Sequence, residues 1–202
     1  MPGQRASETL RRQQILKAAH QVALGQGIDG LTVRAVAARA RLSHGLVLFH
    51  FKRKDELVSA LLDRVLAATL SLRVAEDVAP MGGALDRLRA LLLQEVDRLS
   101  GDPHQVRLFL EYWAYGTRRR AIRRKISLAL EHYRAAFRSL AAEVLQVEGA
   151  RFPGVTSERL AAIAVSFING CAVQAMIDLD QFDVGEYLTA VRGILGRRDM
   201  AA

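Results

Sequence analysis

The stretch from Leu31 to Leu57, LTVRAVAARARLSHGLVLFHFKRKDEL, decides the fold of this chain. Apolar residues recur in its first part at steps of three and four, at Val33, Val36, Ala37 and Ala40. This spacing predicts a short amphipathic helix, for which Thr32 is a suitable N-cap. Ser43 is expected to cap a second helix that runs to about Phe49. Two short helices joined by a tight turn have the spacing of a helix-turn-helix, whose second helix can enter the major groove of DNA.

These residues resemble the TetR-type bacterial transcriptional regulators. That family carries a block that reads roughly T-V-x-x-I-A-x-x-A-G-V-S-x-G-x-x-Y-x-H-F-x-x-K-x-x-L, and the chain follows it without a gap. The matching positions are Thr32, Val33, Val36, Ala37, Ala40, Leu42, Ser43, Gly45, His50, Phe51, Lys54 and Leu57. The resemblance covers about the first quarter of the chain. It implies an all-α protein of about nine helices, with a three-helix DNA-binding head and a helical body that binds a ligand and dimerises.

The chain departs from the family block at three positions. Leu48 stands where the block has a tyrosine that bonds to the phosphate backbone, and leucine cannot make that bond. Arg41 stands in place of a turn glycine, so a positive φ there would strain the backbone. Arg53 replaces a helix-capping Ser, Asp or Asn, and the helix that follows is therefore expected to lack a side-chain cap.

Charge is concentrated in the amino-terminal part of the chain. Residues 1–57 hold ten Lys or Arg and four Asp or Glu, which gives them +6 of the total net charge of +8. A basic module on a nearly neutral body indicates a polyanionic partner, although a merely basic soluble surface would have the same composition. The single cysteine, Cys171, excludes an internal disulfide framework. It is expected to be a buried core thiol in a cytoplasmic protein, and no signal peptide is predicted at the start of the chain.

The first helix is expected to begin near Ser7 and to end at the glycines of residues 25–27, leaving residues 1–6 as a loose tail. We assign residues 1–54 to the DNA-binding domain and residues 55–202 to the ligand-binding and dimerisation domain. The expected helices of the second domain run from Lys54 to about Val74, from Leu85 to Leu99, from Pro103 to Tyr115, from Ile122 to near Gly149, between Arg159 and Asp178, and from Val184 to Leu195. The sequence Ala79-Pro80-Met81-Gly82-Gly83 breaks the pattern between the first two of these.

The last two helices are predicted to form a homodimer interface. Eighteen uncharged residues lie between Arg159 and Asp178, a length that barely reaches the minimum for a membrane span. No flanking basic or aromatic belt supports insertion, so a helix buried on both sides is the better interpretation. Two helices from each of two chains would make a four-helix interface, as the TetR resemblance also implies. A dimer would require a pseudo-palindromic operator in double-stranded DNA.

Nine residues of the head are the candidate DNA contacts. Hydroxyl, imidazole and cationic groups suit phosphate oxygens, and Thr32, Arg34, Ser43, His50 and Lys54 are the candidates for that role. His50 could instead pack beside Phe51, and Arg34 could face water. His44, Leu46 and Phe49 are expected at exposed positions of the recognition helix, and Gly45 leaves room for close approach of the backbone. Such an apolar reading surface predicts that DNA shape carries part of the specificity.

The resemblance also implies a pocket for a small-molecule effector in the body. The candidate lining residues are Phe109, Tyr112, Trp113, Tyr133 and Phe137. The segment FLEYW weakly resembles the choline-to-betaine synthesis regulators of the family, and aromatic rings with Glu111 or Asp178 nearby could hold a cation. An aromatic stripe of this spacing also suits a hydrophobic core, and the effector is therefore left open.

Other functions fit the sequence less well. Residues 118–125 contain six cations, which suit either a solvated helix face or a second phosphate contact if this corner folds back beside the head. The chain has no glycine-rich phosphate loop, nucleophile elbow or H-E-x-x-H pair, and its histidines form no ligand cluster. We therefore expect no enzymatic activity, no cofactor and no metal site. The alternative function is that of a helical interaction or sensor protein whose head, with Leu48, binds DNA weakly.

Overall fold

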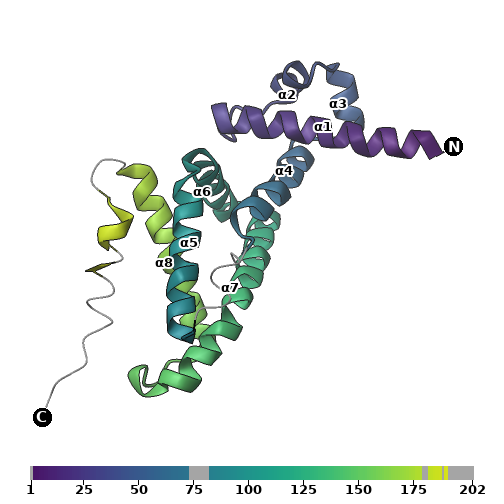
Figure 1. The fold of residues 1–202 in the computed structure, drawn as a ribbon. Helices are drawn as coiled ribbons and strands as arrows, with labels where there is room; N and C mark the ends of the chain where they lie inside the picture. Colours follow the sequence, from purple (N-terminus) through teal and green to yellow (C-terminus); the bar gives the residue numbers. More distant parts are fainter. Residues whose placement is uncertain (1, 73–81, 179–181, 188, 191–202) are drawn as a thin grey trace, which may run out of the picture. The chain divides into compact units, whose positions relative to one another are not determined.

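The computed structural model describes residues 2–72, 82–178, 182–187 and 189–190, and this part of the chain is all-α, as predicted (Figure 1). Its helices are α1 (Pro2–Gln26), α2 (Val33–Ala40), α3 (His44–His50), α4 (Lys54–Thr69), α5 (Ala84–Ser100), α6 (Pro103–Thr117), α7 (Arg120–Glu148), the 3-10 turn η1 (Gly149–Arg151) and α8 (Ser157–Ile177). By its internal contacts the chain forms two compact units.

Unit 1 comprises residues 1–71 and 107–130 and contains the predicted head. The helix α1 crosses α2 and α3 (Figure 1) and contributes small buried residues such as Ala19 and Ala23, which allow close approach of the helices. Val36 of α2 and Val47 of α3 are fully buried in the same core. Phe51, which follows α3, is fully buried with them, and this confirms the predicted three-helix core.

The carboxyl-terminal part of α6 packs on the other elements of unit 1 through polar contacts. The hydroxyl of Tyr112 donates to the carbonyl of Val58 at 2.8 Å, and burial raises the pKa of this phenol well above its usual value. The carboxylate of Glu111 accepts a hydrogen bond from the backbone N–H of Ile28 at 2.7 Å. Gly27 has a φ of 71° there, and a Cβ at this position would meet the Glu111 carboxylate at 2.8 Å. The positive φ of this turn favours glycine, and a Cβ at this position would also displace the Glu111 carboxylate.

Unit 2 comprises the described parts of residues 72–106 and 131–202. Its core is built mainly by α5 and α8, with the remainder of α7. Among the described residues, α8 is the one helix long and apolar enough to cross a membrane, with a mean hydropathy of 1.9, but core helices of soluble proteins pass the same test. One face of α8 is buried at Ala164 and Ile168, whereas Ile163 and Ile177 remain 59% and 75% exposed. Within a single chain this helix is thus buried on one side only.

Several predicted boundaries differ from those of the structure. The helix α1 begins at Pro2, not near Ser7, so residues 2–6 are helical where a loose tail was expected. Proline is compatible with the first helical position because its missing N–H would be unpaired there anyway. The helix α4 ends at Thr69, before the predicted Val74, which lies outside the described residues.

The linker and the last helix are described only in part. Residues 79–81 of the predicted break are outside the described residues, and Gly83 is the N-cap of α5. Residues 184–187, 189 and 190 of the predicted last helix are helical, and the Asp183 carboxylate accepts from the Glu186 N–H at 2.8 Å at its start. The remainder, including Val191, Ile194 and Leu195, lies outside the described residues. The division into domains at residue 54 stays a prediction.

Candidate nucleic-acid interface

The caps of α2 and α3 form as the sequence predicts. The Thr32 hydroxyl accepts a hydrogen bond from the N–H of Ala35 at 3.1 Å, and the Ser43 hydroxyl accepts one from Leu46 at 3.1 Å. A capping hydroxyl that accepts still has its own hydrogen to donate. Both hydroxyls lie on exposed residues. They can therefore cap their helices and donate to a phosphate oxygen at the same time.

The turn between α2 and α3 places Arg41 in a left-handed conformation. Its φ is 55° and its ψ is 45°, and it is the one non-glycine residue with positive φ among the described residues. The N–H of Leu42 donates to the carbonyl of Ala37 at 2.9 Å, which closes the end of α2 in the manner of a Schellman motif. The family glycine at this position is thus explained, and Arg41 adopts the same turn at the cost of strain.

The recognition helix α3 exposes most of the residues expected on its surface. His44, Gly45 and Phe49 are exposed, the last at 74%, while Val47 is fully buried and fixes the opposite face to the core. The prediction that Leu46 is exposed is corrected, because its side chain is half-buried. Leu46 lies about 100° around the helix from the buried Val47, so it falls at the edge between the buried and the exposed faces.

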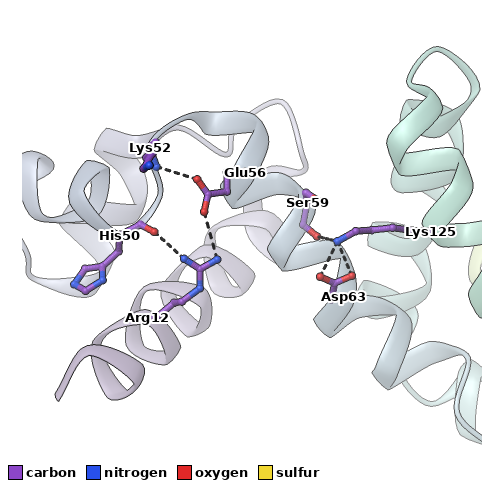
Figure 2. Close-up of polar contacts among 7 residues, drawn as sticks. All are labelled: Arg12, His50, Lys52, Glu56, Ser59, Asp63 and Lys125. Atoms are coloured by element: carbon purple, nitrogen blue, oxygen red, sulfur yellow. Dashed lines mark hydrogen bonds and ion pairs between the residues drawn. The ribbon is translucent and has the colours of Figure 1, made fainter. Parts of the chain in front are cut away.

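The end of α3 is fixed by Arg12 of α1, which sequence reasoning missed. Figure 2 shows its guanidinium donating to the His50 carbonyl at 2.7 Å and lying 3.5 Å from a carboxylate oxygen of Glu56. The guanidinium also stacks over the Phe51 ring, 4.1 Å from its centroid. The other oxygen of Glu56 accepts from the Lys52 N–H at 3.1 Å. One side chain of α1 thus joins the end of α3 to the beginning of α4.

The remaining candidates for phosphate contact lie on the surface of unit 1. Arg34 and Lys54 are exposed, and His50 is half-buried. The imidazole of His50 packs edge-on against Phe49, with 5.2 Å between ring centroids. The helix α4 begins at Lys54 without a side-chain cap from Arg53, as predicted. Its first-turn N–H groups and Lys54 are the groups there that suit an anion.

The five candidate ligand residues are divided between the two units. Phe109 and Trp113 of α6 form an edge-to-face pair in unit 1. Tyr112 of the same helix is fully buried. Tyr133 and Phe137 of α7 form a similar pair in unit 2, with centroids 5.4 Å apart. A separate open pocket of unit 1, about 910 Å³ in volume, contains none of the five. It is lined by Ile28, Asp29, Glu111, Ala114, Tyr115, Thr117, Arg118 and Arg119.

A fully buried acid, Glu95 of α5, lies beside the pair of Tyr133 and Phe137. Glu95 is fully buried and accepts from the Tyr133 hydroxyl at 2.5 Å and from Arg98 at 2.6 Å. Burial, together with the hydrogen bond to Glu95, raises the pKa of Tyr133 well above its usual value. The sequence contains a signal for this residue, because Glu95 occupies a core position in the helical repeat between Leu91 and Leu99.

Comparison with protein families gives two matches, which together cover most of the chain. Residues 15–61 match the description "Bacterial regulatory proteins, tetR family", and residues 84–198 match "BetI-type transcriptional repressor, C-terminal". The chain belongs to the TetR family. It is therefore a DNA-binding transcriptional regulator with a helix-turn-helix, in a family of regulators and not of enzymes.

Individual relatives agree with this assignment. The chain is 31% identical to an HTH-type transcriptional regulator in the dhlA 5′ region of Xanthobacter autotrophicus, over 91% of this chain and 89% of that one. It is 28% identical to the regulator BetI of Paraburkholderia phymatum, over 86% and 85%.

Solved structures of regulators share the fold of this TetR-family chain. A regulator from Saccharomonospora viridis in complex with choline has a TM-score of 0.73 and 16% identity, over 94% of this chain and 97% of that one. FadR from Bacillus subtilis in complex with stearoyl-CoA has a TM-score of 0.68 and 20% identity, over 91% and 96%.

Proposed function

We propose that this TetR-family regulator is a repressor that binds a pseudo-palindromic operator as a homodimer and is released by a small-molecule effector. The observation that carries the proposal is the surface of α3, where His44, Gly45 and Phe49 are exposed while Val47 holds the helix in the core. A short helix anchored on one face and open on the other suits insertion into a major groove.

The proposed division of roles follows the chemistry of each residue. Thr32, Arg34, Ser43, His50 and Lys54 contact phosphates and fix the register of the head on the duplex. His44, Leu46 and Phe49 meet base edges or thymine methyl groups. A Cβ at Gly45 would meet no protein atom within 4 Å, so the fold itself does not require glycine there. Close approach of the helix backbone to DNA is a reason for glycine that lies outside the fold.

The proposed dimer forms through α8 and the helical segment that follows it. Ile163, Ser166, Gln174 and Ile177 are exposed on α8 in the single chain. Tyr187 of the following segment stacks on Phe167 with 5.7 Å between ring centroids, so the two segments are joined by an aromatic contact. Removing the two isoleucine side chains from water would stabilise a dimer by about 1.5–3 kcal/mol for each side chain fully buried.

The proposed effector binds beside one of the two aromatic clusters, either Phe109, Tyr112 and Trp113 of unit 1 or Tyr133 and Phe137 of unit 2. Aromatic faces attract quaternary ammonium groups, and a neighbouring carboxylate adds charge attraction. Choline is the first probe to use, because the Saccharomonospora regulator has been solved with it and the carboxyl-terminal part of this chain matches the BetI type. An effector can act only if it binds one dimer geometry more tightly than the other.

The test is a fluorescence anisotropy titration of the full chain against labelled fragments of genomic DNA, at two salt concentrations. Binding that tightens on a small subset of fragments, and that weakens steeply as salt rises, is the expected result. Equal and weak binding to all fragments would contradict the proposed function. Addition of choline to the preferred fragment then tests the effector, since release is expected and indifference would exclude choline.

A further inference from the structure

The basic run before and within the first turns of α7 separates into anchored and unpaired cations. Arg119 forms an ion pair with Asp55 of α4 at 3.1 Å, and its guanidinium lies 4.2 Å from the centroid of the Tyr115 ring. Lys125 donates to both carboxylate oxygens of Asp63 at 2.7 and 2.8 Å and to the Ser59 carbonyl at 3.1 Å (Figure 2). All of these residues belong to unit 1. The run is thus held against α4 at two points.

The other arginines of this run have no acidic partner among the described residues. Arg118, Arg120, Arg123 and Arg124 are exposed, and no carboxylate of the described chain lies within 4.0 Å of them. We call these four residues the basic corner. Arg120, Arg123 and Arg124 are spaced by three and four positions, so they share one face of α7 while Ile122 and Ile126 are buried on the other.

Such an arrangement is unfavourable for the chain alone. Like charges at helical spacings of three and four destabilise a helix by about 0.2–0.5 kcal/mol per pair. Arg119 and Lys125 of the same run are neutralised by Asp55 and Asp63. Within the described part of the chain, no acidic residue neutralises the positive charges of the basic corner. An external polyanion would remove this repulsion, and release of its counterions would favour binding.

The corner is also joined to the candidate DNA-binding surface. Asp55, the partner of Arg119, is the neighbour of Lys54 in the first turn of α4, and Lys54 is a proposed phosphate contact. The anchored residue therefore brings the basic run to the end of α4 that faces the phosphates in the proposed function. Double-stranded DNA has one negative charge for about every 1.7 Å of its axis, so further phosphates are available along the same backbone.

We propose that the basic corner of Arg118, Arg120, Arg123 and Arg124 is a second phosphate-binding surface, which contacts duplex DNA beside the segment read by α3. The inference rests on the proposed function, because it requires the head to bind a duplex. It assigns to the start of α7 a role that is independent of base sequence. Its contribution is electrostatic and is therefore measured by salt dependence.

The test compares the full chain with the triple variant R120Q/R123Q/R124Q on a mixed-sequence duplex of about 40 base pairs, long enough for flanking phosphates to be available. Anisotropy titrations over several salt concentrations give the slope of log K against log salt. Each phosphate contact contributes about −0.9 to this slope, so loss of three contacts is expected to flatten it by roughly 2 to 3. The triple variant R120K/R123K/R124K keeps the charges and is expected to retain most of the slope.

Two further variants separate the possible outcomes. K54A serves as the reference for a contact of the head and is expected to flatten the slope by about 1. R151Q/R159Q removes two exposed arginines of unit 2, one of them paired with Glu148, and shows how far the loss of two charges elsewhere changes the slope. Little change is expected. A slope that is unchanged in R120Q/R123Q/R124Q but flattened in K54A would overturn the proposed role of the basic corner and leave the proposed function intact. A full chain that binds no duplex would overturn both.

A vesicle arm tests a different anionic partner. Vesicles of phosphatidylglycerol and phosphatidylcholine are titrated with the full chain and with R120Q/R123Q/R124Q. The inference expects no difference between the two on vesicles. Vesicle binding lost in the glutamine variant, with the DNA slope unaltered, would assign the corner to a membrane surface and contradict the proposal. Melting temperatures of all variants within a few degrees of the parent confirm that the comparison concerns folded protein.

Discussion

Arg12 makes three contacts with a single guanidinium, and its loss should affect DNA binding more than folding. The variant R12A removes a charged hydrogen bond to the His50 carbonyl, an ion pair with Glu56 and the stacking on Phe51. Its side chain is 41% exposed, so a loss of about 1 kcal/mol in unfolding free energy is expected once solvent screening is considered. The free energy of DNA binding should weaken by more than this amount, because the end of α3 is no longer fixed.

Arg11 provides the matched control for this prediction. It is the neighbouring exposed arginine, and its hydrogen bond is to Gln14 of the same helix. The variant R11A should leave both the melting temperature and the affinity nearly unchanged. Thermal unfolding and anisotropy titration of the two variants make the comparison. Equal effects in R11A and R12A would show that general charge, and not the position of α3, accounts for the loss.

Arg41 offers a gain in stability. Its left-handed conformation costs a residue with a Cβ about 1–2 kcal/mol, which glycine would not incur. Glycine adds entropy to the unfolded chain, so the net gain of R41G is expected to be about 0.5–1 kcal/mol. The variant R41A also removes the charge but keeps the Cβ, and should bring no such gain. Urea unfolding gives the unfolding free energies of the parent and the two variants. An R41G variant less stable than the parent would contradict the claim that Arg41 strains the backbone.

At the scale of elements, the sequence predicted the helices better than their contacts. The caps at Thr32 and Ser43, the uncapped start at Arg53 and the start of α6 at Pro103 depend on residues close in sequence, and all were confirmed. Local chemistry decides such features. The Arg12 contacts join residues 38 and 44 positions apart, so no periodicity within one helix could indicate them.

The candidate ligand residues illustrate the same limit. Their helical spacing predicted burial, and Phe109, Tyr112, Tyr133 and Phe137 are buried. Spacing along one helix could not say which acid lies nearby, because Glu95 belongs to another helix than Tyr133. The one indication in the sequence was that Glu95, a charged residue, occupies a core position of α5.

The helix α8 holds Cys171, whose reactivity is predicted by its burial. Burial raises the pKa of this thiol to about 11, and the side chain is 1% exposed. Thiolate is the reactive form, so very little of it exists near neutral pH in the folded protein. Reaction with Ellman's reagent at pH 7.5 should be slow for the native chain and complete in denaturant. Rapid native labelling would instead support a redox-sensitive interface.

At the scale of the whole molecule, the dimer depends on the exposed face of α8. The variant I163R places a charge on a side chain that is 59% exposed in the single chain, so each chain should still fold. Light scattering after size-exclusion chromatography is expected to show a dimer for the parent and a monomer for the variant. Leu128 of α7 is 55% exposed, and L128R is the matched control, expected to remain dimeric. A parent chain that is monomeric at all concentrations would contradict the proposed interface.

The pairing of two recognition helices has a consequence for the DNA sequence. In vitro selection of the full chain from a random duplex library, followed by sequencing of the bound fraction, tests it most directly. The proposed function predicts two inverted half-sites whose centres lie about one helical turn apart, roughly 34–36 Å, or at a related spacing. A library that is not enriched, or enrichment of a single asymmetric motif, would contradict it.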